Sequence, residues 1–427
     1  MNRTIGNIFK GDKVIWMIFF FLCLISIVEV YSSSSTLSYK SGNYWWPAVK
    51  HTSQILLGFI AMVITLHIEC RYFKSMTIFL LGGSFLMLVM VLILGHATNG
   101  AQRWLTIFGI QFQPSEIAKG ALILSVAQIL SAMQTEKGAD RRAVRYILIT
   151  CAFIIPLILV ENFSTAFLLS TVIFCMMFIG LVPLKQLGKI MGIVVITGAM
   201  GLALIMVSPN EQTADDPVVA EMTADDASKE EPGKIAKVFH RFSTWKSRIL
   251  SFTNKEDIKP EDFDLDKHSQ VGHSNIAIAT SNIIGKGPGN SEERDFLPQA
   301  YSDFIYTIII EETGIGGAFI VALLYIILLF RTGQIANRCE NMFPALLSMG
   351  LALQLVTQAL FNMLVAVGLA PVTGQPLPLI SRGGTSTIIN CIYVGVILSI
   401  SRSAKQRPKD SKKVVVAPNI HTQPAMQ

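Results

Sequence analysis

The sequence has few charged residues for its length. They make up 15% of the 427 residues, whereas soluble proteins contain about a quarter. Apolar residues account for 51%, and the mean hydropathy is +0.50. The alternation typical of a membrane β-barrel is also absent. Because an isolated strand in lipid would leave its backbone groups unpaired, we expect an all-α integral membrane protein.

The six cysteines form no CxxC pair and no metal-ligand spacing, and none lies between residues 208 and 302. We therefore expect neither a disulfide framework nor a protein-built metal site. A cleavable signal peptide is not indicated either. The first apolar block, 14–31, is long and is followed by no small-residue cleavage site, so we expect it to remain as a span.

The apolar residues fall in blocks long enough to cross a bilayer as helix, which takes about 20 residues. We predict ten transmembrane helices in a single polytopic domain, 1–427. Their ranges are 14–31, 51–68, 76–95, 115–133, 144–160, 164–182, 190–207, 303–330, 342–366 and 384–401.

Basic residues gather in alternate connections of this ten-span arrangement. They are Arg3, Lys10, Lys13, Arg71, Lys74, Lys137, Arg141, Arg142, Arg145, Lys185, Lys189, Arg331, Arg338, Arg402, Lys405, Arg407, Lys409, Lys412 and Lys413. Cytoplasmic loops carry such an excess of lysine and arginine. We therefore expect both termini in the cytoplasm, residues 403–427 to form a basic cytoplasmic tail, and residues 208–302 to form a large extracytoplasmic loop between helices seven and eight.

The net charge of +6 follows from this topology and does not indicate a nucleic-acid partner. Residues 208–302 hold 17 acidic and 11 basic side chains, which leaves 24 basic against 12 acidic elsewhere. Within the loop, 208–233 is acidic and poor in large apolar residues, so we expect a disordered insert. The stretch 237–252 has an amphipathic helical pattern. It could lie on the membrane surface or pack on the rest of the loop.

Three polar clusters lie at the expected outer boundary of the membrane. The first is GAQRWLTIFGIQFQPSEIAKG, residues 100–120. Gln113, Pro114 and Ser115 are typical of a helix start. Glu116 and Lys119 follow as i,i+3 neighbours on one face, and intramembrane charges of this kind favour function. A structural pair that fixes the helix start is the alternative.

The second cluster, LPQAYSDFIYTIIIEETG (297–314), places Asp303 in the first turn of the eighth span, where the helix dipole favours a carboxylate. Glu311 and Glu312 lie about two turns deeper and need partners or water. The cations that we expect near them are Lys119, Arg103 and Arg382.

The third cluster is GLAPVTGQPLPLISRGGTS, residues 368–386. So much proline and glycine predicts irregular backbone, which membranes tolerate only against protein or a water-filled cavity. Gly383 and Gly384, with Ser381 beside them at a helix start, would also suit an anion. We expect the three clusters to converge on one cavity suited to an amphiphilic substrate with phosphate and sugar.

These three motifs, in this order and spacing, resemble the signatures of the SEDS family of bacterial wall synthesis, which includes RodA and FtsW. The resemblance runs from the first span to the last. It implies ten spans in the bacterial cytoplasmic membrane and a peptidoglycan glycosyltransferase that polymerises lipid II. It also implies that the protein acts together with a class B penicillin-binding protein (an FtsI-like transpeptidase) and other divisome membrane proteins. Arg382 stands where RodA-like chains usually have an aromatic residue, so the chain is more similar to the division-type FtsW branch.

The resemblance places the catalytic carboxylate on Asp303, as general base. It implies cations for the pyrophosphate leaving group, for which Arg103, Lys119 and Lys286 are candidates; a divalent cation, Mg or Mn, would also fit there. The matching residues near the substrate cavity are Arg103, Trp104, Gln113, Pro114, Ser115, Glu116, Lys119, Lys286, Ser381, Gly383 and Gly384. Glu311, Glu312 and Arg382 lie in the same motifs.

One stretch departs from the family pattern. Members often carry Gln-Pro-Asp-x-Gly-Thr between spans five and six, where this chain has Glu161-Asn162-Phe163-Ser164-Thr165. We assign no catalytic role there. Two other functions remain open from the residues alone: a lipid II flippase, and a non-catalytic scaffold for division proteins. Transporters tend to contain internal repeats, and the sequence shows no convincing one.

Overall fold

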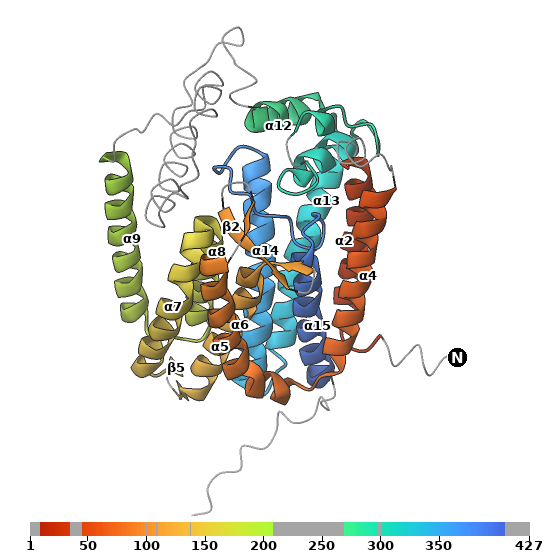
Figure 1. The fold of residues 1–427 in the computed structure, drawn as a ribbon. Helices are drawn as coiled ribbons and strands as arrows, with labels where there is room; N and C mark the ends of the chain where they lie inside the picture. The colour runs from red at the N-terminus through yellow and green to blue at the C-terminus, as the bar shows by residue number, and fades with distance from the viewer. Residues whose placement is uncertain are drawn as a thin grey trace, which may run out of the picture.

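The chain folds into a bundle of long helices (Figure 1). A computed structural model describes residues 9–34, 45–94, 96–98, 101–107, 110–136, 138–207, 269–297 and 300–405. The predicted disordered insert, the amphipathic stretch at 237–252 and most of the basic tail lie outside these residues.

Each of the ten predicted segments coincides with a helix. These helices are α2 (Lys13–Ser32), α4 (Trp46–His67), α5 (Cys70–Leu94), α6 (Pro114–Ala132), α7 (Arg141–Glu161), α8 (Phe163–Ile179), α9 (Leu184–Val207), α13 (Ile305–Ala336), α14 (Met342–Ala366) and α15 (Thr385–Lys405). In the described part of the chain, eight of them are long and apolar enough to cross a membrane, and α8 is shorter, at 17 residues. The molecule belongs to the all-α class of multi-span membrane proteins.

Several boundaries differ from the prediction. Helix α4 begins at Trp46 and α5 at Cys70, five and six residues before the expected positions. Pro47 at the start of α4 explains the first difference, because proline fits the opening turn of a helix. Helix α13 begins at Ile305, so Asp303 lies in the turn before the helix and not in its first turn.

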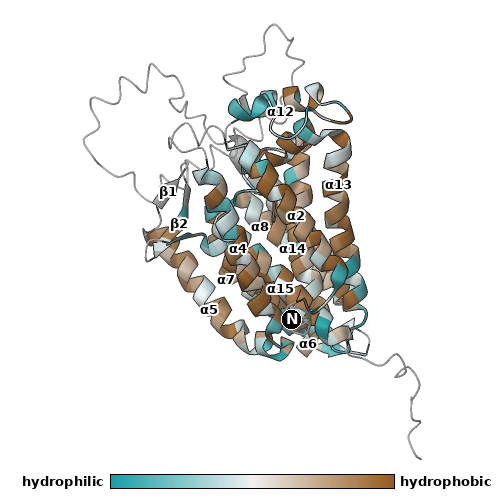
Figure 2. Ribbon diagram, turned by 90° about the vertical axis from the view of Figure 1, so that its right-hand side faces the viewer, coloured by the Kyte–Doolittle hydropathy of each residue, from teal (hydrophilic) through white to brown (hydrophobic). Residues whose placement is uncertain are grey.

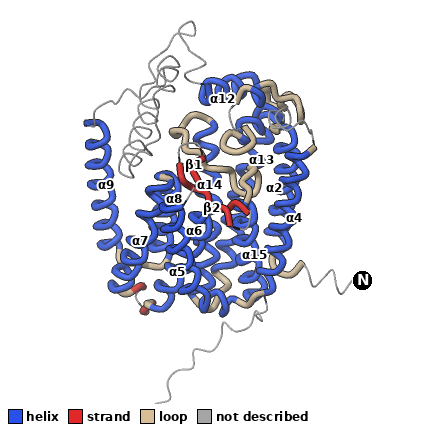
Figure 3. The backbone as a smooth tube through the Cα atoms, in the orientation of Figure 1, coloured by secondary structure: helices blue, strands red, loops and turns tan. Residues whose placement is uncertain are grey.

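Short strands interrupt the helical pattern, and the sequence did not predict them. Strands β1 (His96–Thr98), β2 (Ala101–Ile107) and β3 (Ile110–Phe112) form a small antiparallel sheet in that order (Figure 3). Strands β4 (Gln134–Thr135) and β5 (Gly138–Ala139) pair between α6 and α7. The first polar motif is therefore a hairpin that leads into α6.

Burial separates central helices from peripheral ones. Two-thirds of the apolar windows of α6, α14 and α15 are buried inside the bundle, against 22% for α5. Hydrophobic residues predominate along the long helices, and hydrophilic residues concentrate towards the two ends of the bundle (Figure 2). This is the distribution expected where the outer helices contact lipid and the central helices contact each other.

Helices α2 and α15 bring the two ends of the described chain to the same end of the bundle (Figure 1). There the backbone N–H of Asp12 donates to Ser401 Oγ at 2.9 Å, and Arg331 Nη2 lies 2.9 Å from Asp12 Oδ2. Asp12 also caps α2, where it accepts from the N–H of Val14. We call this the basic end. The opposite end carries α12 (Ser269–Thr280) and is called the α12 end.

Helix α13 is kinked at Gly314, which has φ 72° and ψ −177°. The kink interrupts the helical hydrogen bonds of the preceding turn. A loop that follows α12 supplies substitutes: the N–H groups of Lys286 and Gly287 donate to the carbonyls of Glu311 and Glu312 at 2.9 and 2.8 Å. The loop and the kink therefore stabilise each other, since neither leaves buried backbone groups unpaired.

The loop after α12, residues 281–297, is called the docked loop below. We expect Gly314→Ala to destabilise its packing against α13. The backbone conformation is one that only glycine adopts readily, which costs another residue about 1–3 kcal/mol. A Cβ at this position would also overlap the carbonyl oxygen of Ile283. Limited proteolysis of residues 281–297 and the thermal unfolding midpoint measure the effect. Gly316→Ala is the matched control, because its Cβ would lie 3.6 Å from the same oxygen; equal effects of both substitutions would contradict the proposed strain.

Candidate functional site

Asp303 lies half-buried at the α12 end, in the turn that leads into α13. Ser302 Oγ donates to Asp303 Oδ1 at 2.9 Å. The carboxylate lies against the third polar motif, since a Cβ built on Gly374 would be 3.3 Å from Asp303 Oδ2. Gly374 itself has φ 67°. A glycine there leaves room for the carboxylate and accommodates the tight backbone.

The backbone around Asp303 is fixed by hydrogen bonds from distant parts of the chain. Asn362 Nδ2 on α14 donates to the carbonyl of Asp303 at 2.8 Å. Ser381 Oγ donates to the carbonyl of Ser302 at 2.6 Å, and the N–H of Arg382 donates to the carbonyl of Tyr301 at 3.0 Å. Two long-range bonds thus hold the second motif to the third, and one holds it to α14. Together they position a carboxylate without using its own oxygens.

The first motif joins the same network through a buried ion pair. Lys119 Nζ lies 2.8 Å from Glu116 Oε1 and also donates to Gln358 Oε1 at 3.0 Å. Both charged residues are almost fully buried, at 1% and 3% exposure. Gln358 Nε2 in turn donates to the carbonyl of Pro376, in the third motif, at 2.9 Å. The expectation that the three motifs meet is therefore supported by a continuous chain of contacts.

The remaining predicted residues of the first motif frame the start of α6. Gln113 precedes the helix, and its Nε2 donates to Ser115 Oγ at 3.0 Å, while Pro114 occupies the first helical position. Arg103 and Trp104 lie on β2, both partly buried. Arg103 Nε donates to the carbonyl of Glu161 at 3.1 Å, which ties the hairpin to the end of α7.

The glycines of the third motif lie immediately before α15, where the backbone needs their small size and conformational freedom. Gly384 has φ 59°, a conformation that favours glycine, and a side chain on Gly383 would overlap Ser386 Oγ. The guanidinium of Arg382 lies over the ring of Tyr301, 5.5 Å from its centroid, within the range of a cation–π contact.

The expected partners of Glu311 and Glu312 were wrong. Neither Lys119, Arg103 nor Arg382 neutralises them. Glu311 Oε1 pairs with Lys286 Nζ at 2.8 Å, and its Oε2 accepts from Ser291 Oγ at 2.5 Å. The docked loop supplies these partners.

Glu312 is held in the same way. It accepts a hydrogen bond from Ser32 Oγ at the end of α2, and Arg294 Nη1 donates to the same Ser32 Oγ at 3.1 Å. Lys286, predicted as a substrate cation, therefore lies in the polar group that the docked loop forms with Glu311 and Glu312. Its described contacts go to Glu311 and Glu292.

The hydrogen bond that Lys286 donates to Glu311 raises the pKa of Lys286 above its ordinary value of 10.5. A raised folded-state pKa means that the ion pair contributes fully below the ordinary value and is lost as the pH rises through the folded value. We therefore expect residues 281–297 to resist proteolysis equally from about pH 7 to pH 10 and to lose protection above that range. Lys286→Met should be less protected and show no such alkaline step. An identical step in the variant would contradict the assignment.

Sequence reasoning missed a buried polar row on α14. Gln354, Gln358 and Asn362 recur every four residues on one face, and all three are at most 2% exposed. The spacing in an otherwise apolar helix was the available signal, because buried polar residues in membrane helices pair with one another or line a site.

Polar residues of α8 and of the last loop also meet at this site. Gln375 Nε2 donates to Thr165 Oγ1 at 2.8 Å, and Asn162 caps α8 by accepting from the N–H of Ser164 at 3.0 Å. The stretch that departs from the family pattern thus packs against the third motif. The part of the chain that the structure describes brings together no three His, Cys, Asp or Glu side chains for a metal ion.

Comparison with known proteins assigns the family. The sequence profile of the FtsW/RodA/SpoVE family, described as cell cycle protein, matches residues 12–216 and 232–406. The chain belongs to this family. The predicted SEDS membership is confirmed, and the unmatched residues 217–231 fall within the acidic insert predicted at 208–233.

Relatives of similar length span most of the chain. A Geobacter sp. (strain M18) protein named probable peptidoglycan glycosyltransferase FtsW is 29% identical over 395 residues, covering 91% of this chain and 96% of its own. The Geobacter sulfurreducens (strain DL-1 / KN400) protein of the same name is 28% identical and covers 96% and 100%.

Two solved structures share the fold of this SEDS protein. A chain from a structure described as "Structural coordination of polymerization and crosslinking by a peptidoglycan synthase complex" superimposes with a TM-score of 0.67, at 21% identity, and covers 93% of this chain and 99% of that one. The rod shape determining protein RodA of Thermus thermophilus gives a TM-score of 0.61, at 21% identity, and covers 93% and 98%.

Proposed function

We propose that this SEDS protein is a peptidoglycan glycosyltransferase that polymerises lipid II at the α12 end of the bundle. The observation that carries the proposal is the position of Asp303. Its carboxylate lies against Gly374, Asn362 binds its backbone carbonyl, and Ser381 binds the carbonyl of the preceding residue. A base that must meet a mobile substrate benefits from such a rigid support. The names of the curated relatives are consistent with this activity.

In the proposed reaction Asp303 acts as general base. It accepts the proton of the acceptor's sugar hydroxyl as that oxygen forms a bond to the anomeric carbon of the donor. The bond from this carbon to the pyrophosphate oxygen breaks, and undecaprenyl pyrophosphate leaves as an anion. Preorganised cations would stabilise the charge that develops on it. We propose Arg103, Lys119 and Lys286 for this role, with Trp104 and the start of α6 contacting the substrate.

We further propose ten spans, with the basic end in the cytoplasm and the α12 end outside the bacterial cytoplasmic membrane. The alternation of basic connections supports this orientation, and so does the common position of the start of α2 and the end of α15 at the basic end. Residues 208–302 would then form the extracytoplasmic loop, with 208–233 as a disordered insert. Residues 403–427 would form the cytoplasmic tail.

For the biological role we propose septal wall synthesis with a class B penicillin-binding protein of the FtsI type and other divisome membrane proteins. Support comes from the FtsW names of the relatives and from Arg382 in the third motif. The structural match described as a peptidoglycan synthase complex is consistent with a synthase partner.

Reconstitution tests the activity directly. The purified full chain, its cognate class B penicillin-binding protein and fluorescent lipid II are combined in liposomes, and glycan strands are separated by length. Long strands that form in the presence of moenomycin would support the proposal, because that inhibitor excludes a contaminating transglycosylase of the other kind. Scrambling of lipid II across the bilayer without strands would favour a flippase. The absence of both strand formation and scrambling would favour a scaffold.

A further inference from the structure

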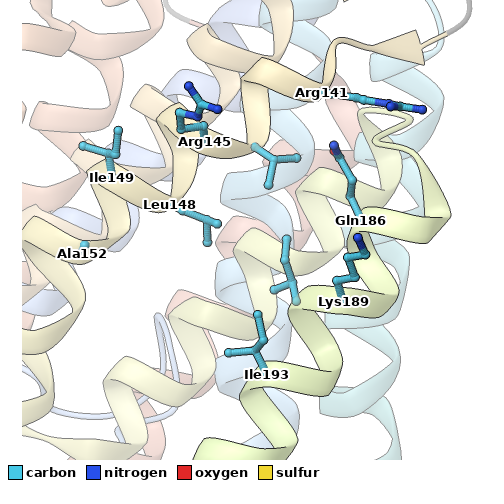
Figure 4. Close-up of a pocket in the computed structure, with 10 residues that line it drawn as sticks. Arg141, Arg145, Leu148, Ile149, Ala152, Gln186, Lys189 and Ile193 are labelled. Carbon is cyan, nitrogen blue, oxygen red and sulfur yellow. The ribbon is translucent and has the colours of Figure 1, made fainter.

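Helices α7 and α9 border an open groove of about 540 Å³ near the basic end. Leu148 and Ile149 of α7 and Ile193 of α9 line its apolar part (Figure 4). Arg141 and Lys189 face the same groove from the two helices, with Arg145 one turn further along α7. The groove therefore combines an apolar channel with cations.

The groove exists because α9 stands apart from the bundle (Figure 1). Its main packing contact is with α8. Consecutive apolar residues of α9 are exposed in every direction, among them Ile193 at 61% and Ile196 at 67%. A Cβ on Gly188 or Gly192 would meet no atom within 4 Å. Such a gap between apolar helices at membrane depth must be filled by something apolar.

The cations specify the headgroup of the occupant. In the part of the chain that the structure describes, neither Arg141, Arg145 nor Lys189 forms an ion pair with a carboxylate. Basic pockets between membrane helices on the cytoplasmic side bind phosphate-bearing lipid headgroups. The positions of the charges relative to Leu148 and Ile193 thus match an anionic headgroup joined to an acyl chain.

We propose that the groove between α7 and α9 binds one anionic glycerophospholipid of the cytoplasmic leaflet, with its phosphate on Arg141, Arg145 and Lys189. The assignment of this lipid to the cytoplasmic leaflet depends on the orientation proposed above. The binding of the lipid in the groove does not depend on it. The lipid would fill the space beside α9 and hold this helix against the bundle. This site lies at the opposite end of the molecule from Asp303.

Native mass spectrometry of the full-length protein, equilibrated with equimolar phosphatidylglycerol and phosphatidylcholine, tests the proposal. We expect one retained phosphatidylglycerol per chain. The triple variant Arg141→Gln/Arg145→Gln/Lys189→Gln should lower the preference for the anionic lipid by at least about tenfold, since each basic side chain near an anionic headgroup favours it by roughly fivefold before screening. The matched control, Lys13→Gln/Lys74→Gln/Arg402→Gln, removes the same charge outside the groove and should retain the lipid.

Equal retention in the two triple variants would overturn the site, as would no preference in the wild type. A second readout replaces Ile193 by cysteine and identifies the molecules that become cross-linked to this cysteine in membranes. Adducts with a protein helix in place of lipid would also overturn the proposed lipid site. Because lipid II takes no part in these measurements, loss of polymerisation would leave the result unaffected. Failure here would likewise leave the polymerase proposal standing.

Discussion

Replacing Asp303 by asparagine is expected to lower the rate of lipid II polymerisation by about 10²- to 10⁴-fold, the contribution typical of a positioned general base. Asparagine keeps the shape of the side chain and can still accept the hydrogen bond from Ser302 Oγ. It cannot take the proton of the acceptor hydroxyl. The fold should therefore survive, and the loss should appear in the chemical step.

The measurement is the initial rate of strand formation at saturating lipid II, together with the thermal unfolding midpoint of each variant. Glu292→Gln is the matched control, because this carboxylate lies in the docked loop and its side chain is 76% exposed. It should keep its activity. Asp303→Glu should retain part of the rate, since it restores a base at altered distance. Near-normal activity of Asp303→Asn with an unchanged midpoint would exclude the base assignment.

The helices were predictable because the membrane imposes a length and a hydropathy that single blocks of sequence carry. Residues 14–31 and 342–366 coincide closely with α2 and α14 for this reason. The hairpin of β1 to β3 was not predictable in the same way. Its seven-residue central strand pairs locally and has no apolar alternation that would separate it from a loop.

The contacts among the predicted site residues were predictable only in part. Glu116 and Lys119 are three residues apart, and their pairing follows from helical geometry alone. Glu312 instead meets Ser32, 280 positions away, and Glu311 meets Lys286 in a loop that packs where Gly314 interrupts α13. A kink of this kind depends on tertiary contacts, which a sequence pattern does not contain.

Because the Glu116–Lys119 pair is buried, we expect it to have a large effect on the free energy of unfolding. Lys119→Met is expected to lower the free energy of unfolding by about 3–5 kcal/mol, because it leaves the carboxylate of Glu116 buried without its cation. Oε2 of Glu116 already accepts no hydrogen bond from the described residues. The loss of Lys119 would also free Gln358, which links α6 to the loop beside Asp303.

A double-mutant cycle with Glu116→Gln separates the pair from its surroundings, with unfolding followed in one fixed detergent and lipid mixture. The double variant should be more stable than Lys119→Met alone, since no unpaired charge remains. Arg71→Met is the control: Arg71 and Glu69 are also 2.8 Å apart, but their side chains are 71% and 55% exposed, so the change should stay within about 1 kcal/mol. Similar losses in Lys119→Met and Arg71→Met would contradict a role for burial, because the two pairs have the same length and differ chiefly in their exposure to solvent. Loss of polymerisation by Lys119→Met without loss of stability would support the proposed contact between Lys119 and the substrate.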